Sequence, residues 1–180
     1  MNWKTPLAGT WAGTSLLLLA LWIGQLPNAV ASAAPWQQLR PVGQGEMSWL
    51  WFKLYDVTFY SETGRYQPGI YPQALTLTYA RSIEREDLLN ATAAEWQRLG
   101  LGSAADQQRW LTQLAGLWPD VTQGDKLTFY VDKSGAGHFW WHDKLLGSLA
   151  DPHFSSSFLA IWLNDNSREP ALTRRLRGQP

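Results

Sequence analysis

The chain has 180 residues, of which 45% are hydrophobic and 17% are charged. This is the composition of one ordinary globular domain and excludes a disordered or fibrous protein. Fifteen basic residues balance fifteen acidic ones, so no net charge would attract a nucleic acid, and the absence of cysteine excludes disulfides, thiolate metal sites and cysteine nucleophiles.

Residues 1–33 are predicted to be a cleavable signal peptide. A single early lysine precedes an apolar run over residues 16–23, and small residues then match cleavage motifs ending at Ala31 or Ala33. We therefore expect a periplasmic or secreted bacterial protein without a stable membrane anchor after cleavage. The alternative is an uncleaved anchor, but the apolar run is shorter than the roughly 20 residues that span a bilayer. Residues 34–180 form the predicted domain.

A Gly-x-Gly turn at residues 43–45 is predicted to lead into one long strand. Apolar and polar side chains alternate over residues 46–60, which places Tyr55 on the same face as Val57, with Asp56 on the other. If Asp56 is buried, it needs a hydrogen-bond donor, and a structural role is then favoured over acid-base chemistry.

Residues 74–81 form the second predicted strand, after a loop over residues 64–72 that is rich in glycine and proline. The alternation places Leu77, Tyr79 and Arg81 on one face and threonines on the other. One strand face thus carries apolar, phenolic and guanidinium groups in that order.

Two helices are predicted next. The first covers residues 85–99 and ends at Gly100. Ser103 and Asp106 have the spacing of a capping box for the second, which Pro119 ends. Both helices carry an apolar stripe that includes tryptophan, as expected for helices that cover a sheet.

The second half is predicted to be a three-stranded meander followed by two helices. The strands cover residues 126–131, 137–141 and 145–149. Asp151, followed by proline, begins one helix, and Pro170 opens a short basic helix. The predicted class is α+β, an open-faced sandwich with one curved antiparallel sheet covered by helices on one side.

Several segments, in this order, resemble the chalcone isomerase family. Residues 52–60, FKLYDVTFY, resemble the start of that fold. Residues 147–163 and 169–172 resemble the end of the family's bacterial, exported, chalcone-isomerase-like branch. The resemblance covers residues 36–178 and implies a chalcone-isomerase-like fold.

The resemblance also bears on activity. In the plant enzymes, an arginine just after the Gly-x-Gly turn stabilises the phenolate and the developing enolate. Residues 43–48 contain no arginine, and Glu46 would oppose an anion. Arg40 lies upstream and is the remaining candidate. Tyr55 stands where the enzymes carry threonine, as in the non-catalytic and fatty-acid-binding relatives, so we predict no catalytic residue.

The non-catalytic relatives imply a site for a fatty acid or another amphipathic small molecule. Such a site needs an apolar slot for the tail and hydrogen-bond donors for the head group. The predicted ligand-binding residues are Tyr55, Leu77, Tyr79 and Arg81. In the competing interpretation, Arg81 is a surface residue that is solvated or paired with a nearby glutamate, and the twelve tryptophans form a packed core.

Other chemistry has weaker support. His138 and His142 would share a strand face, but without a third ligand we predict no metal site and no cofactor. His153 and the serines at 155–157 lack a nucleophile-elbow pattern. Two alternatives to ligand binding stay open: an intramolecular lyase or isomerase of unknown substrate, and an envelope accessory protein that acts through a protein partner.

Overall fold

The computed structural model describes residues 33–179. The predicted signal peptide lies outside the described residues, except for Ala33, and its cleavage stays a prediction. None of the helices in the described part is long and apolar enough to cross a bilayer.

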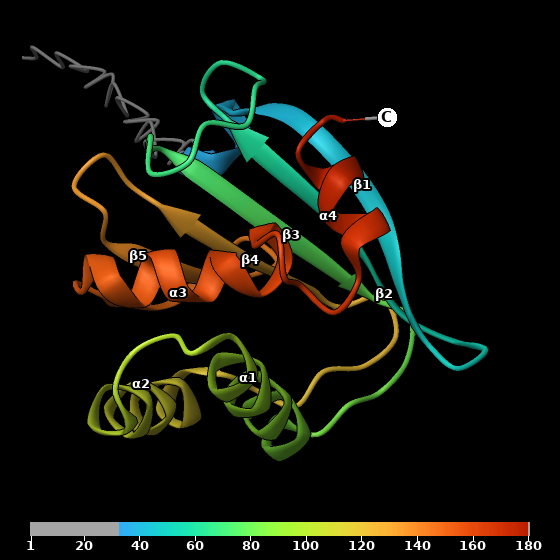
Figure 1. Cartoon of the computed structure of the whole chain (residues 1–180), viewed down its shortest axis with the longest axis vertical. Helices are drawn as coiled ribbons and strands as arrows, with labels where there is room; N and C mark the ends of the chain where they lie inside the picture. Colours follow the sequence, from blue (N-terminus) through green and yellow to red (C-terminus); the bar gives the residue numbers. More distant parts are fainter. Residues whose placement is uncertain (1–32, 180) are drawn as a thin grey trace, which may run out of the picture. The chain divides into compact units, whose positions relative to one another are not determined.

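Six strands form one antiparallel sheet whose spatial order follows the chain from β1 to β6 (Figure 1). The sheet neighbours β3 and β4 are separated in sequence by the helices α1 and α2. The strands are β1 Arg40–Trp49, β2 Phe52–Ser61, β3 Gln73–Tyr79, β4 Lys126–Val131, β5 Gly137–Trp141 and β6 Lys144–Leu149. The helices are the 3₁₀-helix η1 Pro35–Gln38 and the α-helices α1 Arg85–Leu99, α2 Ala104–Leu117, α3 Pro152–Leu163 and α4 Pro170–Leu176.

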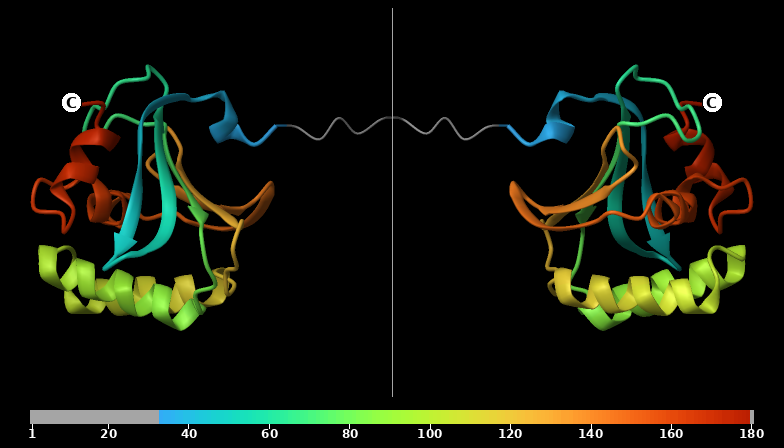
Figure 2. Two further views of the ribbon diagram at one scale, coloured as in Figure 1. Left: turned by 90° about the vertical axis from the view of Figure 1, so that its right-hand side faces the viewer. Right: turned by 90° about the vertical axis from the view of Figure 1, so that its left-hand side faces the viewer.

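Helices α3 and α4 lie against one face of the curved sheet, whereas η1 lies on the other side (Figure 2). Helices α1 and α2 pack side by side below α3 and close the lower end of this layer (Figures 1 and 2). This arrangement confirms the predicted α+β class and its open-faced sandwich.

The predicted helix boundaries are confirmed by their caps. The side chain of Ser103 accepts a hydrogen bond of 3.1 Å from the backbone amide of Asp106, and the Asp106 carboxylate accepts one of 3.2 Å from the amide of Ser103. Gly100 ends α1 in the left-handed conformation. Asp151 caps α3 through a hydrogen bond of 2.9 Å from the amide of His153.

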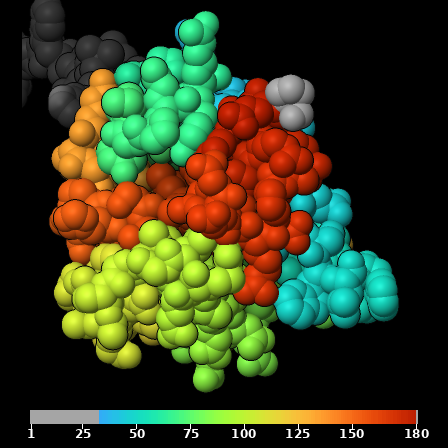
Figure 3. Space-filling view, in the orientation of Figure 1, coloured from blue at the N-terminus to red at the C-terminus, as the bar shows by residue number. Residues whose placement is uncertain are grey.

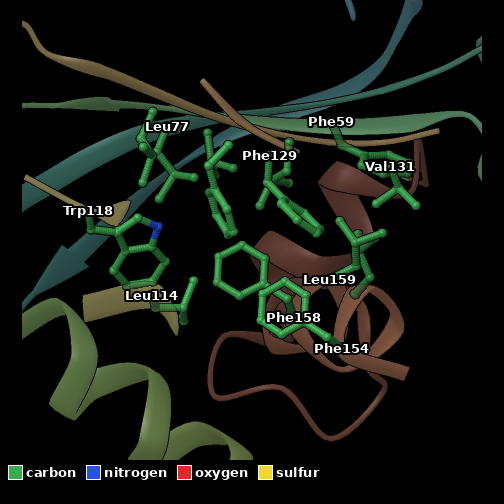
Figure 4. Close-up of a cluster of buried hydrophobic side chains, with 14 of the residues drawn as sticks. Phe59, Leu77, Leu114, Trp118, Phe129, Val131, Phe154, Phe158 and Leu159 are labelled. Atoms are coloured by element: carbon green, nitrogen blue, oxygen red, sulfur yellow. The ribbon is translucent and has the colours of Figure 1, made fainter. Parts of the chain in front are cut away.

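Aromatic side chains fill the space between the sheet and the helices (Figure 4). The rings of Phe129 on β4 and Phe139 on β5 lie 4.7 Å apart, and Phe158 of α3 packs on both. Trp118, at the end of α2, meets the ring of Phe139 edge-on at 5.5 Å. These rings are buried, so core packing explains part of the tryptophan content.

The predicted Gly-x-Gly turn is wrong, because Gly43 and Gly45 lie inside β1. Helix α4 crosses β1 at these positions. A Cβ atom on Gly43 would overlap the carbonyl of Arg175, and one on Gly45 would overlap the side chain of Leu172. The glycines therefore allow a helix to approach a strand closely, and they do not turn the chain.

The single long strand predicted over residues 46–60 is two strands. Trp49 pairs with Phe52, and Leu50 and Trp51 form a two-residue hairpin loop between them. Leu50 has a φ of 55°. A two-residue hairpin loop ordinarily carries glycine or asparagine. Because Leu50 and Trp51 are apolar, nothing in the sequence indicates that the chain reverses direction here.

Candidate functional site

A cavity of about 840 Å³ lies between the sheet and the helices α1, α3 and α4. This volume lies within the range of sites that hold small organic ligands. Its lining is mainly apolar, and residues far apart in sequence contribute to it. The apolar lining includes Met47, Leu54, Leu77, Leu88, Trp118, Val121, Leu127, Phe158, Ile161 and Leu172.

All four residues predicted to bind a ligand line this cavity. Leu77 and Tyr79 are buried, Tyr55 is half-buried and Arg81 is exposed. Tyr55 and Tyr79 are directly opposed on β2 and β3, with ring centroids 5.9 Å apart in an edge-on arrangement. The structure thus brings the four side chains to one wall, and their role in binding stays a prediction.

The two phenols are neutral hydrogen-bond donors. Burial raises the pKa of Tyr55 to about 12, although a hydrogen bond of 3.0 Å from the indole nitrogen of Trp162 to its oxygen acts in the opposite direction. Burial also raises the pKa of Tyr79. Within residues 33–179, the hydrogen of the Tyr55 hydroxyl has no acceptor and the Tyr79 hydroxyl has no partner. Both are therefore available to an acceptor in the cavity.

Arg81 lies where the cavity opens, but it is not part of a strand face, because β3 ends at Tyr79. Its guanidinium carbon lies 5.6 Å from the ring centroid of Phe52, within cation–π distance. No ion pair between Arg81 and a glutamate occurs in the described part of the chain. Arg81 is thus an exposed residue held by an aromatic ring rather than by a carboxylate.

The other charges that line the cavity are mostly negative. Arg168 forms an ion pair of 2.7 Å with Glu95, which also accepts a hydrogen bond from Arg98. Burial would raise the pKa of Glu95, but these two arginines lower it overall. Among the described residues, Arg81 is therefore the cation of this lining without an ionic partner. The exposed acidic residues of the lining are Glu84, Asp87, Asp120 and Glu169.

The geometry of β1 excludes Arg40 from the cavity. Arg40 pairs with Ser61, six residues along β2 from Tyr55, which corresponds to about 20 Å of extended strand. Glu46 is exposed, accepts a hydrogen bond of 2.9 Å from Ser48 and forms an ion pair with a lysine. No arginine of β1 is therefore placed to stabilise an anion in the cavity.

The two histidines predicted to share a strand face do not share one. His142 lies in the turn after β5, has a φ of 52° and contacts Asp125 at 3.1 Å. Residues 33–179 contain no group of three histidine or acidic side chains that could hold a metal ion. Asp56 is exposed and forms an ion pair of 2.7 Å with Lys53, so it serves as a surface partner.

A serine, a histidine and an aspartate are hydrogen-bonded in series on the sheet, away from this cavity. Ser148 contacts Nδ1 of His138 at 2.7 Å, and Nε2 of His138 contacts Asp132 at 2.9 Å. Asp132 also accepts a hydrogen bond of 2.6 Å from Ser134. None of these residues lines the cavity, and the network ties β5 and β6 to the β4–β5 turn.

The sequence did not predict the hydrogen-bond partner of Tyr55 or the contribution of Trp118 to the cavity. Trp162 lies on α3, and its hydrogen bond to Tyr55 spans 107 residues. Trp118 also lines the cavity, and its indole nitrogen is buried without a partner among the described residues. Contacts between residues so far apart in sequence cannot be predicted from local patterns, because the spacing of residues along a helix or strand shows only which residues share a face of that element.

Comparison with known proteins agrees with this fold. Residues 22–178 match the sequence model of the chalcone isomerase-like family. A protein of Haemophilus influenzae is 32% identical over 148 residues, which is 82% of this chain and 72% of that protein. The crystal structure of an Arabidopsis thaliana fatty-acid binding protein superposes with a TM-score of 0.66 at 12% identity, covering 81% of this chain and 90% of that one. The chain therefore belongs to the chalcone isomerase-like family.

Proposed function

We propose that this protein binds one amphipathic small molecule with an apolar chain, such as a fatty acid, and does not catalyse a reaction on it. The observation that carries the proposal is the cavity of about 840 Å³, whose wall combines apolar side chains with two phenol donors and one cation without an ionic partner among the described residues. An apolar wall with a few convergent polar groups is the usual form of a small-molecule site.

The proposed ligand lies with its tail among Leu77, Leu127 and Phe158. Its head group lies between the hydroxyl of Tyr79 and the guanidinium of Arg81, two residues further along the chain. A carboxylate gains charge-assisted hydrogen bonds there. The acidic side chains at the start of α1 repel the same carboxylate, which directs it toward the Arg81 side of the opening.

The structural similarity to a plant fatty-acid binding protein supports this ligand class through the shared fold. Because the two sequences are only 12% identical, the proposal of a fatty acid within this class rests on the residues that line the cavity of this chain.

Calorimetric titration tests the proposal. We expect Arg81→Ala to bind dodecanoic and hexadecanoic acid about ten- to a hundredfold more weakly than the wild type, since a charged hydrogen bond contributes about 1.5–3 kcal/mol. The alcohols of the same chain lengths are the matched ligands, and their affinity should not change. Absence of saturable binding by the wild type, or equal binding of the acids by Arg81→Ala, would overturn the proposal.

A second pair of variants tests whether the ligand occupies this cavity. Ala91 and its neighbour Asn90 are both exposed on α1, but only Ala91 lines the cavity. Ala91→Trp should therefore fill part of the cavity and abolish binding of hexadecanoic acid, while Asn90→Trp should bind it like the wild type. Equal affinity of both variants would place the ligand elsewhere.

We also propose that the domain functions in the periplasm or outside the cell. The support is the predicted cleavage after Ala31 or Ala33. N-terminal sequencing of protein from the soluble envelope fraction should find a chain that starts at Ser32 or Ala34. Recovery from membranes only, with Met1 in place, would contradict this location.

A further inference from the structure

The hairpin formed by β1 and β2 exposes four consecutive apolar side chains at its tip. The exposed fractions are 57% for Trp49, 70% for Leu50, 84% for Trp51 and 54% for Phe52. No charged residue occurs from Met47 to Phe52. This hairpin tip, residues 49–52, projects to the right of α1 and α4, where it is drawn in cyan (Figure 3). Large exposed apolar patches on a soluble domain mark interaction sites.

The backbone of the hairpin tip is strained. Leu50 has a φ of 55°, in the left-handed region that leucine disfavours by roughly 1–2 kcal/mol. Glycine or asparagine would adopt this conformation at a lower cost, as it does in most two-residue hairpin loops. A leucine in this strained conformation, between two tryptophans, points to a function for its exposed apolar side chain.

The hairpin tip is continuous with the opening of the cavity. Trp49 belongs to both, since it lines the cavity and is half exposed. Arg81, at the opening, stacks on the ring of Phe52. A cation therefore lies directly behind the apolar residues, on the side toward the domain.

We propose that the hairpin tip inserts into the surface of a lipid bilayer and holds the cavity opening at the membrane. Tryptophan side chains prefer this interfacial depth, and apolar insertion of a few side chains gives reversible binding. Arg81 then lies at the level of the lipid phosphates, whose charge it complements. The proposal rests on the proposed function, because it supplies the route by which an acyl ligand leaves the bilayer and enters the cavity.

The size of the hairpin tip favours a membrane over a second copy of the chain. Large aromatic side chains bury about 150–250 Å² each when fully covered. Three aromatic side chains and one leucine, all partly exposed, therefore supply roughly 500 Å², which is below the ~800 Å² per partner of a stable protein interface. A bilayer requires no matching surface and accepts such a small apolar tip.

A local fluorescent probe tests insertion with the full chain. Because the chain has no cysteine, Ser48→Cys places one environment-sensitive nitrobenzoxadiazole label beside the hairpin tip. Lys133→Cys places the same label in the β4–β5 turn, at the opposite end of the sheet from the tip. Each labelled protein is mixed with vesicles of phosphatidylethanolamine and phosphatidylglycerol, and its fluorescence emission is recorded. A label at residue 48 reports the depth of the tip even if residues 1–32 hold the chain on the vesicle.

We expect the label at residue 48 to shift to shorter wavelength with vesicles and the label at residue 133 to stay unchanged. When Leu50→Ser and Trp51→Ser are introduced into the protein labelled at residue 48, the lipid concentration needed for the same shift should rise at least about tenfold. The reason is that most of the inserted apolar area is lost. Fatty-acid titration of that variant without vesicles should match the wild type.

Three results would overturn the proposal. The first is an equal response at residues 48 and 133, and the second is an unchanged response in the serine variant. The third is a shift that rises with protein concentration without vesicles, which would identify a second copy as the partner. Fatty-acid binding without insertion refutes the membrane contact alone, whereas insertion without fatty-acid binding refutes the proposed function and the uptake route.

Discussion

The indole nitrogen of Trp162 on α3 donates a hydrogen bond of 3.0 Å to the phenol oxygen of Tyr55 on β2. This bond joins the wall of the cavity formed by the sheet to the wall formed by the helices. In the part of the chain that the structure describes, the hydroxyl hydrogen of Tyr55 has no acceptor, so it can donate into the space between the two walls.

Trp162→Phe should lower the free energy of unfolding by about 1 kcal/mol for the lost hydrogen bond, in addition to the cost of the smaller ring. A double-mutant cycle with Tyr55→Phe separates the two contributions, measured by urea denaturation. We expect a coupling energy of about 1 kcal/mol between the two positions. Additive effects of the two substitutions would show that the bond contributes nothing to stability.

Gly43→Ala should destabilise the domain by about 1–3 kcal/mol, because its Cβ atom would overlap the backbone carbonyl of Arg175 and displace α4 from β1. Gly116 in α2 is the matched control, since nothing lies within 4 Å of a Cβ atom there. Gly116→Ala should instead stabilise by up to about 1 kcal/mol. Equal effects of the two substitutions in thermal unfolding would refute the close approach of α4.

Asp132 should make stability depend on pH in acid. Burial favours its neutral form, but hydrogen bonds from Ser134 and His138 lower the pKa of Asp132 to about 2. Because the unfolded chain has a pKa near 4 for this group, its contribution is complete above about pH 4 and is lost as the pH falls toward 2. The unfolding free energies of Asp132→Asn and the wild type should therefore converge over that interval. A difference that stays constant from pH 7 to pH 2 would contradict this assignment.

Cyclisation of a hydroxylated chalcone should not exceed the uncatalysed rate. The arginine of the plant enzymes has no counterpart on β1, and Arg40 lies about 20 Å along the strand from the cavity. Loss of one preorganised donor typically costs a hundredfold or more in rate. A spectrophotometric assay that follows the loss of the chalcone with and without the protein measures this rate. Stereoselective turnover that Arg81→Ala abolishes would show that this arginine has taken the catalytic role.

Local patterns predicted the helices and the later strands well. The capping box of Ser103 and Asp106 and the glycine after α1 are short-range signals, and both occur where expected. The break at Leu50 was missed because the two-residue loop carries no turn residue and lies in a continuous apolar run over residues 49–52, which is typical of a strand. Gly43 and Gly45 were assigned to a turn because their contacts are with Arg175 and Leu172 of α4, which lie far away in the sequence. Such contacts leave no signal in the local sequence pattern.

The candidate site was predictable only along single elements. Leu77 and Tyr79 share a strand face by alternation, and that face does line the cavity. Arg81 was assigned to the same strand, but the chain leaves the sheet after Tyr79 to enter the helical segment. The contact between Arg81 and Phe52 could not be predicted, because the hairpin that places Phe52 near Arg81 was not recognised in the sequence.

The chain leaves the sheet and returns to it at one point, where Ile83 and Val121 exchange two backbone hydrogen bonds of 3.0 Å each. The segment between them, which includes α1 and α2, contributes no strand to the sheet, in which β3 pairs directly with β4. The chain between Gly100 and Ser103 can therefore be lengthened without a change of strand register. Because α1 forms one wall of the cavity and β2 and β3 carry the two phenols, a longer or shorter helical segment would change the cavity while the sheet keeps its geometry.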